Sequence, residues 1–262
     1  MIYLLTFFFF IIGLVFGSFL NVVIYRFNTN KSLGGRSACV SCSKKLCWYE
    51  LIPLFSFIAL GGRCLVCKSK ISNIYPIVEL VTGLVFLGLF FKFENLFFLS
   101  VPVFIFTYVY YALMFSILIV IAFYDLKHKI IPDLLSTLLG LFSFAGIFFF
   151  DEYGFMIHMP RIIDFFSGFI IALPFLSFWL VSKGRWMGLG DAKLAVGLGF
   201  LLGISRALSG IILSFWIGAL VGIFLLIFNK TYKAKSEIPF APFMVLGTIL
   251  AFLFELHLLP FF

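Results

Sequence analysis

The chain has 262 residues, of which 63% are hydrophobic and 11% are charged, and its mean hydropathy is +1.20. A soluble domain has about half apolar and about a quarter charged residues, so this composition excludes an ordinary soluble globular protein. The net charge of +8 does not indicate a nucleic-acid partner, because in a membrane protein the position of each Lys and Arg relative to the spans matters more than their sum.

Apolar stretches recur along the whole chain at a length close to the roughly 20 residues that cross a bilayer. The first of them has no basic residue before its apolar run and no small-residue cleavage site, so we expect a retained span and not a signal peptide. The sequence therefore predicts an all-α polytopic membrane protein, embedded in lipid, with about eight transmembrane helices. The expected spans are 2–25, 75–93, 96–123, 130–150, 164–182, 189–205, 207–228 and 238–256.

The positions of the basic residues predict the orientation of these spans. If alternate connections are assigned to one side, that side carries sixteen of the nineteen Lys and Arg residues. The other side keeps only Lys92, Arg161 and Arg206. Basic residues accumulate in cytoplasmic connections, so we expect residues 26–74 to form a cytoplasmic loop and both termini to lie outside the cytoplasm.

The 26–74 loop contains two Cys-x-x-Cys motifs that are separated by 21 residues. Four thiolates at this spacing suit tetrahedral zinc, and the reducing cytoplasm disfavours disulfides. We expect a structural zinc ion, which would stabilise a loop too small for a large core; redox thiols or simple packing are the alternatives. The fifth cysteine, Cys47, is expected to be a packed thiol. The four expected ligands are Cys39, Cys42, Cys64 and Cys67.

Two aspartates lie near the ends of predicted spans on the same side of the membrane. Asp125 follows the 96–123 span and Asp191 begins the 189–205 span, 66 positions later. A carboxylate beside hydrocarbon is costly, so each acid is a functional-site hypothesis. Two adjacent carboxyl groups share one proton, so one can activate water while the other polarises a peptide carbonyl, as in aspartic proteases. We therefore expect Asp125 and Asp191 to form a catalytic pair.

The residues around Asp191 favour the close approach of another chain. Gly188 and Gly190 have no side chains, so a substrate strand or a neighbouring helix can approach the backbone there, next to Lys193. Asp133 competes for the catalytic position, although a helix-capping role fits it better. The structural alternative is that each acid sits at the membrane interface and pairs with a nearby lysine.

These motifs resemble the two signature motifs of the type IV prepilin peptidase family. The first motif includes Tyr124-Asp125, Lys127 and Ile131-Pro132-Asp133, and the second is Gly188-Leu189-Gly190-Asp191-Ala192-Lys193. The segments on either side of the cysteine loop, Gly17–Arg26 and Tyr75–Leu80, are similar to the N-terminal part of the bifunctional members. Ile238–Phe243 is similar to a further family segment, with Ala241 where Gly is usual, and we expect it to start a helix and not to take part in chemistry.

The resemblance implies that Asp125 and Asp191 are the catalytic aspartates and that the substrates are type IV prepilins or pseudopilins. It also implies that the N-terminal part supports N-methylation of the newly exposed amino terminus with S-adenosylmethionine. The residues themselves contain no strand and glycine-rich turn of the Rossmann type. Glu50 and Glu79 are candidates for binding or deprotonating the amine; alternatively, Glu50 stabilises a turn and Glu79 pairs with Arg26 or Asn21.

The interpretation is an enzyme of the cytoplasmic (inner) membrane in three parts. Residues 1–25 are the first transmembrane helix, 26–74 the zinc loop associated with methyl transfer, and 75–262 the peptidase helices. A transporter with Asp125 and Asp191 as a proton or cation relay is the rival, but it predicts acids near the bilayer centre and repeat symmetry between halves. A zinc-loop membrane adaptor would leave the two acids unexplained.

Overall fold

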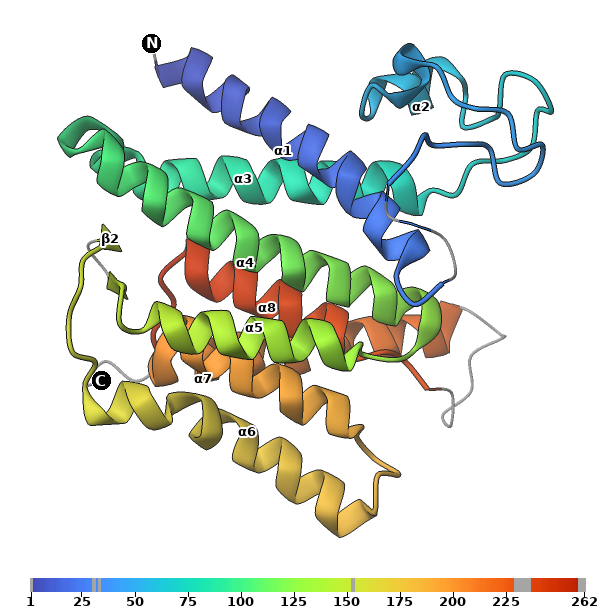
Figure 1. Cartoon of the computed structure of the whole chain (residues 1–262). Helices are drawn as coiled ribbons and strands as arrows, with labels where there is room; N and C mark the ends of the chain where they lie inside the picture. Colours follow the sequence, from blue (N-terminus) through green and yellow to red (C-terminus); the bar gives the residue numbers. More distant parts are fainter. Residues whose placement is uncertain (1, 30–31, 33, 152–153, 229–236, 259–262) are drawn as a thin grey trace. The chain divides into compact units, whose positions relative to one another are not determined.

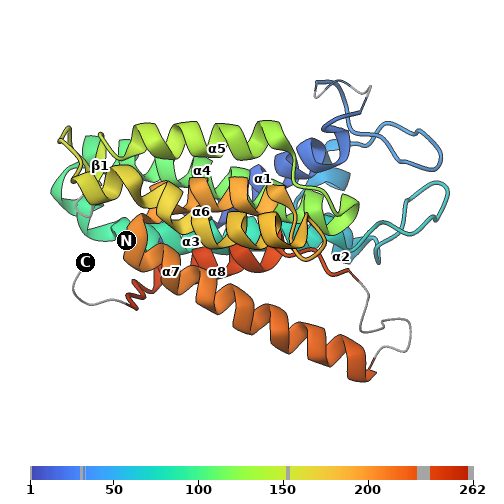
Figure 2. The same cartoon turned by 90° about the horizontal axis from the view of Figure 1, so that it is seen from below.

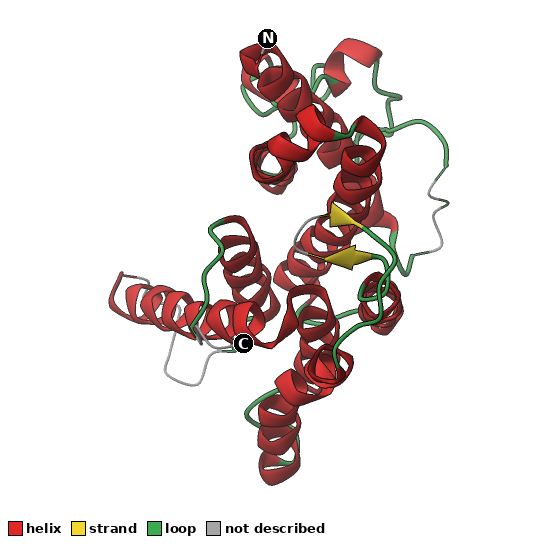
Figure 3. Cartoon of the chain, turned by 90° about the vertical axis from the view of Figure 1, so that its left-hand side faces the viewer, coloured by secondary structure: helices red, strands yellow, loops and turns green. Residues whose placement is uncertain are grey.

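The computed structural model describes the chain except for residues 1, 30–31, 33, 152–153, 229–236 and 259–262. The described part is almost entirely helical, with one small hairpin (Figure 3). It divides into two compact units, Met1–Phe93 and Glu94–Phe262, which are described separately.

The first unit is built on two long apolar helices that cross at small residues (Figure 1). They are α1 (Ile2–Arg26) and α3 (Ile74–Leu99), whose last residues belong to the second unit. A Cβ added to Gly17 of α1 would lie 2.7 Å from the Glu79 Cα of α3, so only glycine allows this contact. Small residues at such crossings let helix backbones approach closely in a membrane, where bulk apolar surface gives no preference for the partner over lipid.

The loop between these helices contains little regular structure. Its two short helices are η1 (Trp48–Leu51) and α2 (Phe55–Ala59). Its backbone hydrogen bonds are mostly local, in the cysteine turns and around α2, and few apolar side chains are buried in the described part of this loop. A loop of this kind needs a further constraint to keep one conformation.

The second unit is a helical bundle that α7 holds together. Its helix α7 packs against α5, α6 and α8, while α4 packs against α5 and α8. The hairpin strands pair antiparallel, with Phe150 opposite Phe155. The elements are α4 (Val101–His128), α5 (Asp133–Gly146), β1 (Phe150–Asp151), β2 (Gly154–Phe155), α6 (Ile162–Ser182), α7 (Leu189–Phe228) and α8 (Ala241–Leu253).

Helix α7 is two helical segments joined at a glycine. Gly203 has φ 71° and ψ 174°, a backbone conformation that interrupts the helix and that residues with a side chain rarely adopt. The first segment is largely buried in the bundle, whereas the second extends away from it after Ser214 (Figure 2). The two expected spans 189–205 and 207–228 therefore correspond to the two helical segments of α7.

Five helices are long and apolar enough to cross a membrane within the described residues, namely α1, α3, α4, α6 and α7. The expected stretches 130–150 and 238–256 form shorter apolar helices, α5 with 14 residues and α8 with 13. A straight span needs about 20 residues, so helix length alone does not set the number of crossings at eight. The chain is a multi-pass, mostly helical membrane protein.

Candidate functional site

Asp125 lies in the last turn of α4 with its side chain directed into the bundle. The residue is only 5% exposed. Its Oδ2 accepts a hydrogen bond of 3.3 Å from the backbone N–H of Ala241, the first residue of α8. The first N–H groups of a helix have no partner within it, so they are available to a carboxylate. Pro242 follows in the first turn, where the N–H that proline lacks is not needed.

Asp191 lies in the first turn of α7, in the same unit. It is partly buried, and the Gly188 backbone lies next to its carboxylate: a Cβ on Gly188 would be 3.5 Å from the Asp191 Oδ2. The start of α7, which carries Asp191, meets the connection that follows Asp125 at the end of α4. The structure thus brings together the two segments that carry the acids singled out from the sequence, and a backbone donor orients Asp125.

Two contacts join the segments that carry these acids. A Cβ on Gly190 would lie 3.0 Å from the Ile131 Cβ in the connection between α4 and α5. Lys193 Nζ forms an ion pair of 2.7 Å with Asp133 Oδ1 at the start of α5. On both sides of Asp191, the start of α7 is therefore held against the segment that follows α4.

These contacts define the surroundings of the other residues expected near the pair. Gly190 faces Ile131 closely, whereas the space around Gly188 contains only the Asp191 carboxylate and the Gly190 nitrogen within 4 Å. Asp133 does not cap α5: Pro132 occupies the N-cap position, and the Asp133 side chain is 73% exposed and pairs with Lys193. Its location in the first turn fits the favourable interaction of an acid with a helix N-terminus.

The Ile238–Phe243 segment starts α8, as expected, but it also supplies the donor to Asp125. This role could not be predicted from the sequence, because the donor is a backbone N–H, which every residue except proline carries. The only signal in this segment is Pro239 and Pro242, which indicate that a helix begins there. The position of that helix start against α4 depends on packing between elements that are more than a hundred residues apart.

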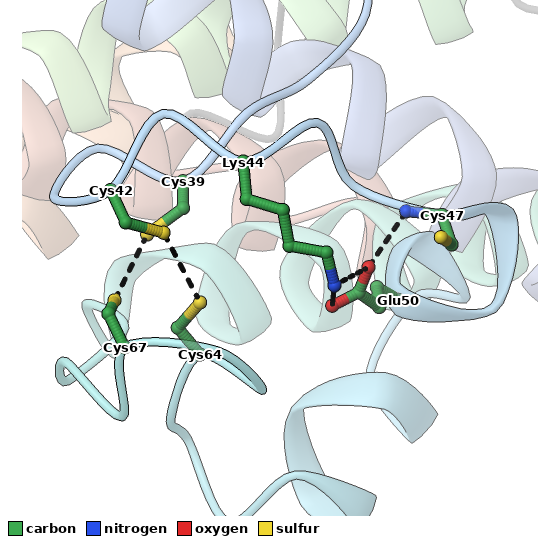
Figure 4. A network of polar contacts seen from close by, with 7 residues as sticks. All are labelled: Cys39, Cys42, Lys44, Cys47, Glu50, Cys64 and Cys67. Atoms are coloured by element: carbon green, nitrogen blue, oxygen red, sulfur yellow. Dashed lines mark hydrogen bonds and ion pairs between the residues drawn. The ribbon is translucent and has the colours of Figure 1, made fainter.

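The four expected zinc ligands converge in the first unit. Their sulfur atoms all lie within 4.8 Å of one another. The Cys39–Cys67 pair is separated by 3.7 Å and the Cys42–Cys64 pair by 4.0 Å (Figure 4). Tetrahedral zinc with Zn–S bonds of about 2.3 Å requires sulfur atoms about 3.8 Å apart, so the cluster fits a metal ion of this kind.

The two cysteine turns have the same backbone structure. Each hydrogen bond in the first turn has a counterpart 25 positions later, and each turn is closed by an isolated antiparallel bridge. Ser43 and Lys68, at equivalent positions, both have φ 57°. The paired hydrogen bonds are Cys39 N to Lys44 O with Cys64 N to Ser69 O, and Ser43 N to Cys39 O with Lys68 N to Cys64 O.

Backbone N–H groups in these turns point at the sulfur atoms. The N–H groups of Cys42 and Ser41 lower the pKa of the Cys39 thiol to about 6. Metal ligands must be thiolates, so a lowered thiol pKa reduces the cost of metal binding at neutral pH. The Ser69 hydroxyl and N–H also lower the pKa of Cys67, whereas desolvation and the neighbouring thiols outweigh the Lys44 N–H and raise the pKa of Cys42 to about 11. The turns therefore favour the ionised form at Cys39 and Cys67. Cys47 lies outside the cluster and is partly buried.

Glu50 is committed to the internal structure of the loop. Its carboxylate accepts the Cys47 N–H at 2.8 Å and forms an ion pair of 3.1 Å with Lys44 (Figure 4). The Cys47 N–H and the Lys44 ammonium lower the pKa of Glu50. Because every strong interaction of Glu50 is with the loop, the geometry favours the turn-stabilising alternative.

Glu79 has different surroundings. It is 8% exposed, and its Oε2 accepts the backbone N–H of Leu54 at 2.9 Å. In the described residues no Lys, Arg or His forms an ion pair with it. Asn21, one of its expected partners, donates instead to the Tyr75 carbonyl oxygen at 3.0 Å. The buried charge of Glu79 is therefore not matched by a cation of the described chain.

Comparison with known proteins gives two adjacent matches that follow this division. Residues 11–93 match the bacterial peptidase A24 N-terminal domain, and residues 112–223 match the type IV leader peptidase family. The chain belongs to the type IV leader peptidase family. The first match contains the cysteine cluster and Glu79, and the second contains Asp125 and Asp191. The resemblance drawn from the motifs is confirmed.

Curated relatives in the type IV leader peptidase family are named prepilin leader peptidase/N-methyltransferase. The one from Myxococcus xanthus is 38% identical over 239 residues, which is 88% of this chain and 66% of that protein. The one from Bacillus subtilis is 30% identical over 97% of this chain and 96% of that protein. The one from Pseudomonas aeruginosa is 29% identical over 93% and 88%. No solved structure matches the chain significantly.

Proposed function

We propose that the protein is a membrane aspartic endopeptidase that removes the leader peptide of type IV prepilins or pseudopilins. The observation that carries the proposal is the contact between the start of α7, which carries Asp191, and the segment that follows Asp125 at the end of α4, through Gly190 with Ile131 and Lys193 with Asp133. Relatives with the corresponding name cover nearly the whole chain. A cut at the cytoplasmic face, where the basic connections predict both acids to lie, follows from the expected orientation.

The pair has the composition required for peptide hydrolysis. With one proton shared between two carboxyl groups, the ionised group accepts a proton from the attacking water and the protonated group donates a hydrogen bond to the scissile carbonyl. The proton then passes to the leaving nitrogen as the C–N bond breaks. The Ala241 N–H would hold Asp125 in place during these steps, and the open space beside Gly188 would admit the substrate backbone. Gly190 and Lys193 support the site through Ile131 and Asp133.

The membrane arrangement in this proposal keeps eight crossings. The two halves of α7 on either side of Gly203 would each serve as one span, and α5 and α8 would cross with help from their flanking residues. Both termini would then lie outside the cytoplasm, in the inner membrane of the cell. The division into a 1–25 span, a 26–74 loop and 75–262 peptidase helices belongs to the same proposal; Asp125 and Asp191 both lie within residues 94–262.

The second activity would be methylation of the new amino terminus with S-adenosylmethionine. The names of the relatives support this step, and the first unit matches the N-terminal domain that accompanies the peptidase. The cysteine cluster would hold one structural zinc ion, since four thiolates leave no coordination position for a substrate. When bound, S-adenosylmethionine supplies the methyl group, while the residues of the chain bind and orient the amine.

The experiment that tests the proposal uses the full chain in proteoliposomes with a prepilin substrate and S-adenosylmethionine. Mass spectrometry of the product separates the two activities, because cleavage removes the leader and methylation adds about 14 Da to the new terminus. The proposal predicts both changes, with methylation only after cleavage. An intact prepilin after incubation with folded, membrane-inserted protein would contradict the peptidase, and a cleaved but unmethylated product would contradict the second activity alone.

A further inference from the structure

The first unit contains a buried amide oxygen without a partner, on the face of α1 that meets α3. Asn21 is 2% exposed, and its Nδ2 donates to the Tyr75 carbonyl oxygen. A carbonyl oxygen only accepts hydrogen bonds, so this contact fixes the orientation of the amide. The Asn21 Oδ1 then has no donor in the described part of the chain. Buried polar atoms are rarely left in this state, so the site calls for a donor from elsewhere.

The unmatched carboxylate of Glu79 belongs to the same contact between α1 and α3. Gly17 lies one helical turn before Asn21 on α1, and its Cβ position would be 2.7 Å from the Glu79 Cα. Tyr75, which binds Asn21, lies one turn before Glu79 on α3. Asn21 and Glu79 therefore occupy adjacent levels of one helix crossing. A buried carboxylate is costly without a cation. In the described part of the chain, Glu79 therefore lacks a positive charge and Asn21 Oδ1 lacks a hydrogen-bond donor.

Two neighbouring features add to this arrangement. The rings of Tyr25 and Tyr75 stack with their centroids 4.6 Å apart and their planes at 4°, at the next level of the crossing. Exposed ring faces of tyrosine attract cations. Leu54, whose N–H binds Glu79, has φ 59° and ψ −50°, which is unfavourable for a residue with a side chain. Such strain persists where the surroundings enforce it, and it occurs at functional sites more often than elsewhere.

We infer that Asn21 and Glu79, together called the Asn21–Glu79 site, bind a primary α-ammonium group. The ammonium provides the positive charge that Glu79 lacks and an N–H for Asn21 Oδ1. A phosphate or carboxylate ligand would provide neither. The inference rests on the proposed methyl transfer, in which both reactants carry such a group: the amino-acid portion of S-adenosylmethionine and the new N-terminus of the pilin. The observed residues fit this part of either reactant.

The test measures binding to the full chain in detergent by isothermal titration calorimetry, separately from activity. The two probes are S-adenosylhomocysteine, which keeps the α-ammonium of the methyl donor, and a peptide with the mature pilin N-terminus. The variants are Glu79→Gln, which keeps shape and the acceptor for Leu54 while removing the charge, and Asn21→Leu, which removes the acceptor. The matched control is Glu94→Gln, the same change later on α3 and outside the site.

Both site variants should bind one of the two probes about tenfold or more weakly, because each loses a hydrogen bond to a charged group, and the control should bind as wild type. Weaker binding of S-adenosylhomocysteine assigns the site to the methyl donor. Weaker binding of the peptide by the site variants assigns the site to the pilin terminus. In that case the wild-type protein should also fail to bind the peptide when its amino terminus is acetylated. Wild-type protein that binds neither probe, or site variants that bind both as wild type does, would overturn the inference.

Leader cleavage keeps this result distinct from the proposed function. Both site variants should still cleave prepilin, since Asp125 and Asp191 lie in the other unit, and this shows that they are folded. Protein that cleaves normally and yet binds as wild type refutes the Asn21–Glu79 site and leaves the peptidase intact. If Glu79→Gln does not accumulate, Asn21→Leu decides alone, because leucine has nearly the shape of asparagine and is readily accommodated in an apolar helix.

Discussion

In the described part of the chain, neither Asp125 nor Asp191 forms an ion pair with a charged side chain. The Ala241 N–H donates to Asp125, and the Gly188 backbone lies next to the Asp191 carboxylate. A backbone donor orients a carboxylate without forming an ion pair that would have to be broken during proton transfer. Residues at the rim, such as Asp133, have an ion-pair partner instead. This contrast separates the two acids proposed for chemistry from the one that supports them.

The Asp133–Lys193 ion pair should contribute little to stability and only indirectly to activity. Its side chains are 73% and 41% exposed, and exposed pairs contribute about 0–1 kcal/mol. Asp133→Asn should therefore retain cleavage within about tenfold of wild type, as should Lys193→Met. The measurement is the initial rate of leader removal at equal amounts of inserted protein. A complete loss of cleavage in Asp133→Asn would give this residue the catalytic place assigned to Asp125.

At the residue level, the sequence predicts functional side chains that are energetically costly near hydrocarbon. It does not predict which backbone N–H groups donate to them, because every residue except proline carries one. Asp125, Asp191 and the cysteines stand out because acids near apolar spans and closely spaced thiols are uncommon without a role. The Ala241 N–H and the Leu54 N–H carry no such signal. The sequence suggests Asn21 only as a partner of Glu79, because the unpaired oxygen of Asn21 depends on its amide nitrogen donating to Tyr75.

The cysteine turns show how a short element becomes stable without a core. Both turns place backbone N–H groups toward sulfur atoms, and the four sulfurs already lie at separations that suit zinc. The Cys-x-x-Cys spacing predicted correctly that the four thiols converge. It did not predict that the two turns repeat the same hydrogen bonds, because the residues between the cysteines differ.

Metal analysis tests this element directly. Purified protein should contain about one zinc per chain, and the paired change Cys64→Ser with Cys67→Ser should remove it, because two ligands do not complete a tetrahedral site. Cys47→Ser is the matched control and should keep the metal, since Cys47 lies outside the cluster and the change keeps its backbone N–H for Glu50. Folded wild-type protein without zinc, or zinc lost equally in the control, would contradict the assignment.

Helix boundaries were predicted well where polar residues end an apolar run. They were predicted poorly where a helix is shorter than the apolar run that contains it. The first span and α6 match their expected ranges closely. Hydropathy extends through residues 130–150 and 238–256, but Pro132 delays the start of α5 and the β1–β2 hairpin follows its end. The break in α7 at Gly203 lies inside a continuous apolar run. It is close to the connection that the sequence predicts between the spans 189–205 and 207–228.

At the scale of the whole molecule, the acids and the thiols belong to different compact units. Sequence alone suggested the separation through the two sets of motifs, and the two domain matches follow it closely. Orientation in the membrane depends on the distribution of Lys and Arg along the chain.

The separation predicts that loss of zinc affects the two activities unequally. The Cys64→Ser, Cys67→Ser variant should lose most methyl incorporation, because the cluster lies in the same unit as Asn21 and Glu79, and it should retain most leader cleavage. Both products can be measured by mass in one reaction. Equal loss of cleavage and methylation, in protein that accumulates normally, would show that the two units do not act separately.

The central claim is that Asp125 and Asp191 act as one catalytic pair, and single isosteric changes test it most directly. Asp125→Asn and Asp191→Asn each keep the shape of the side chain and remove its ability to take up or release the shared proton. Leader cleavage is measured for each variant in proteoliposomes at the same level of inserted protein as wild type. The account predicts no detectable cleavage by either variant, whereas cleavage at the wild-type rate by either one would contradict it.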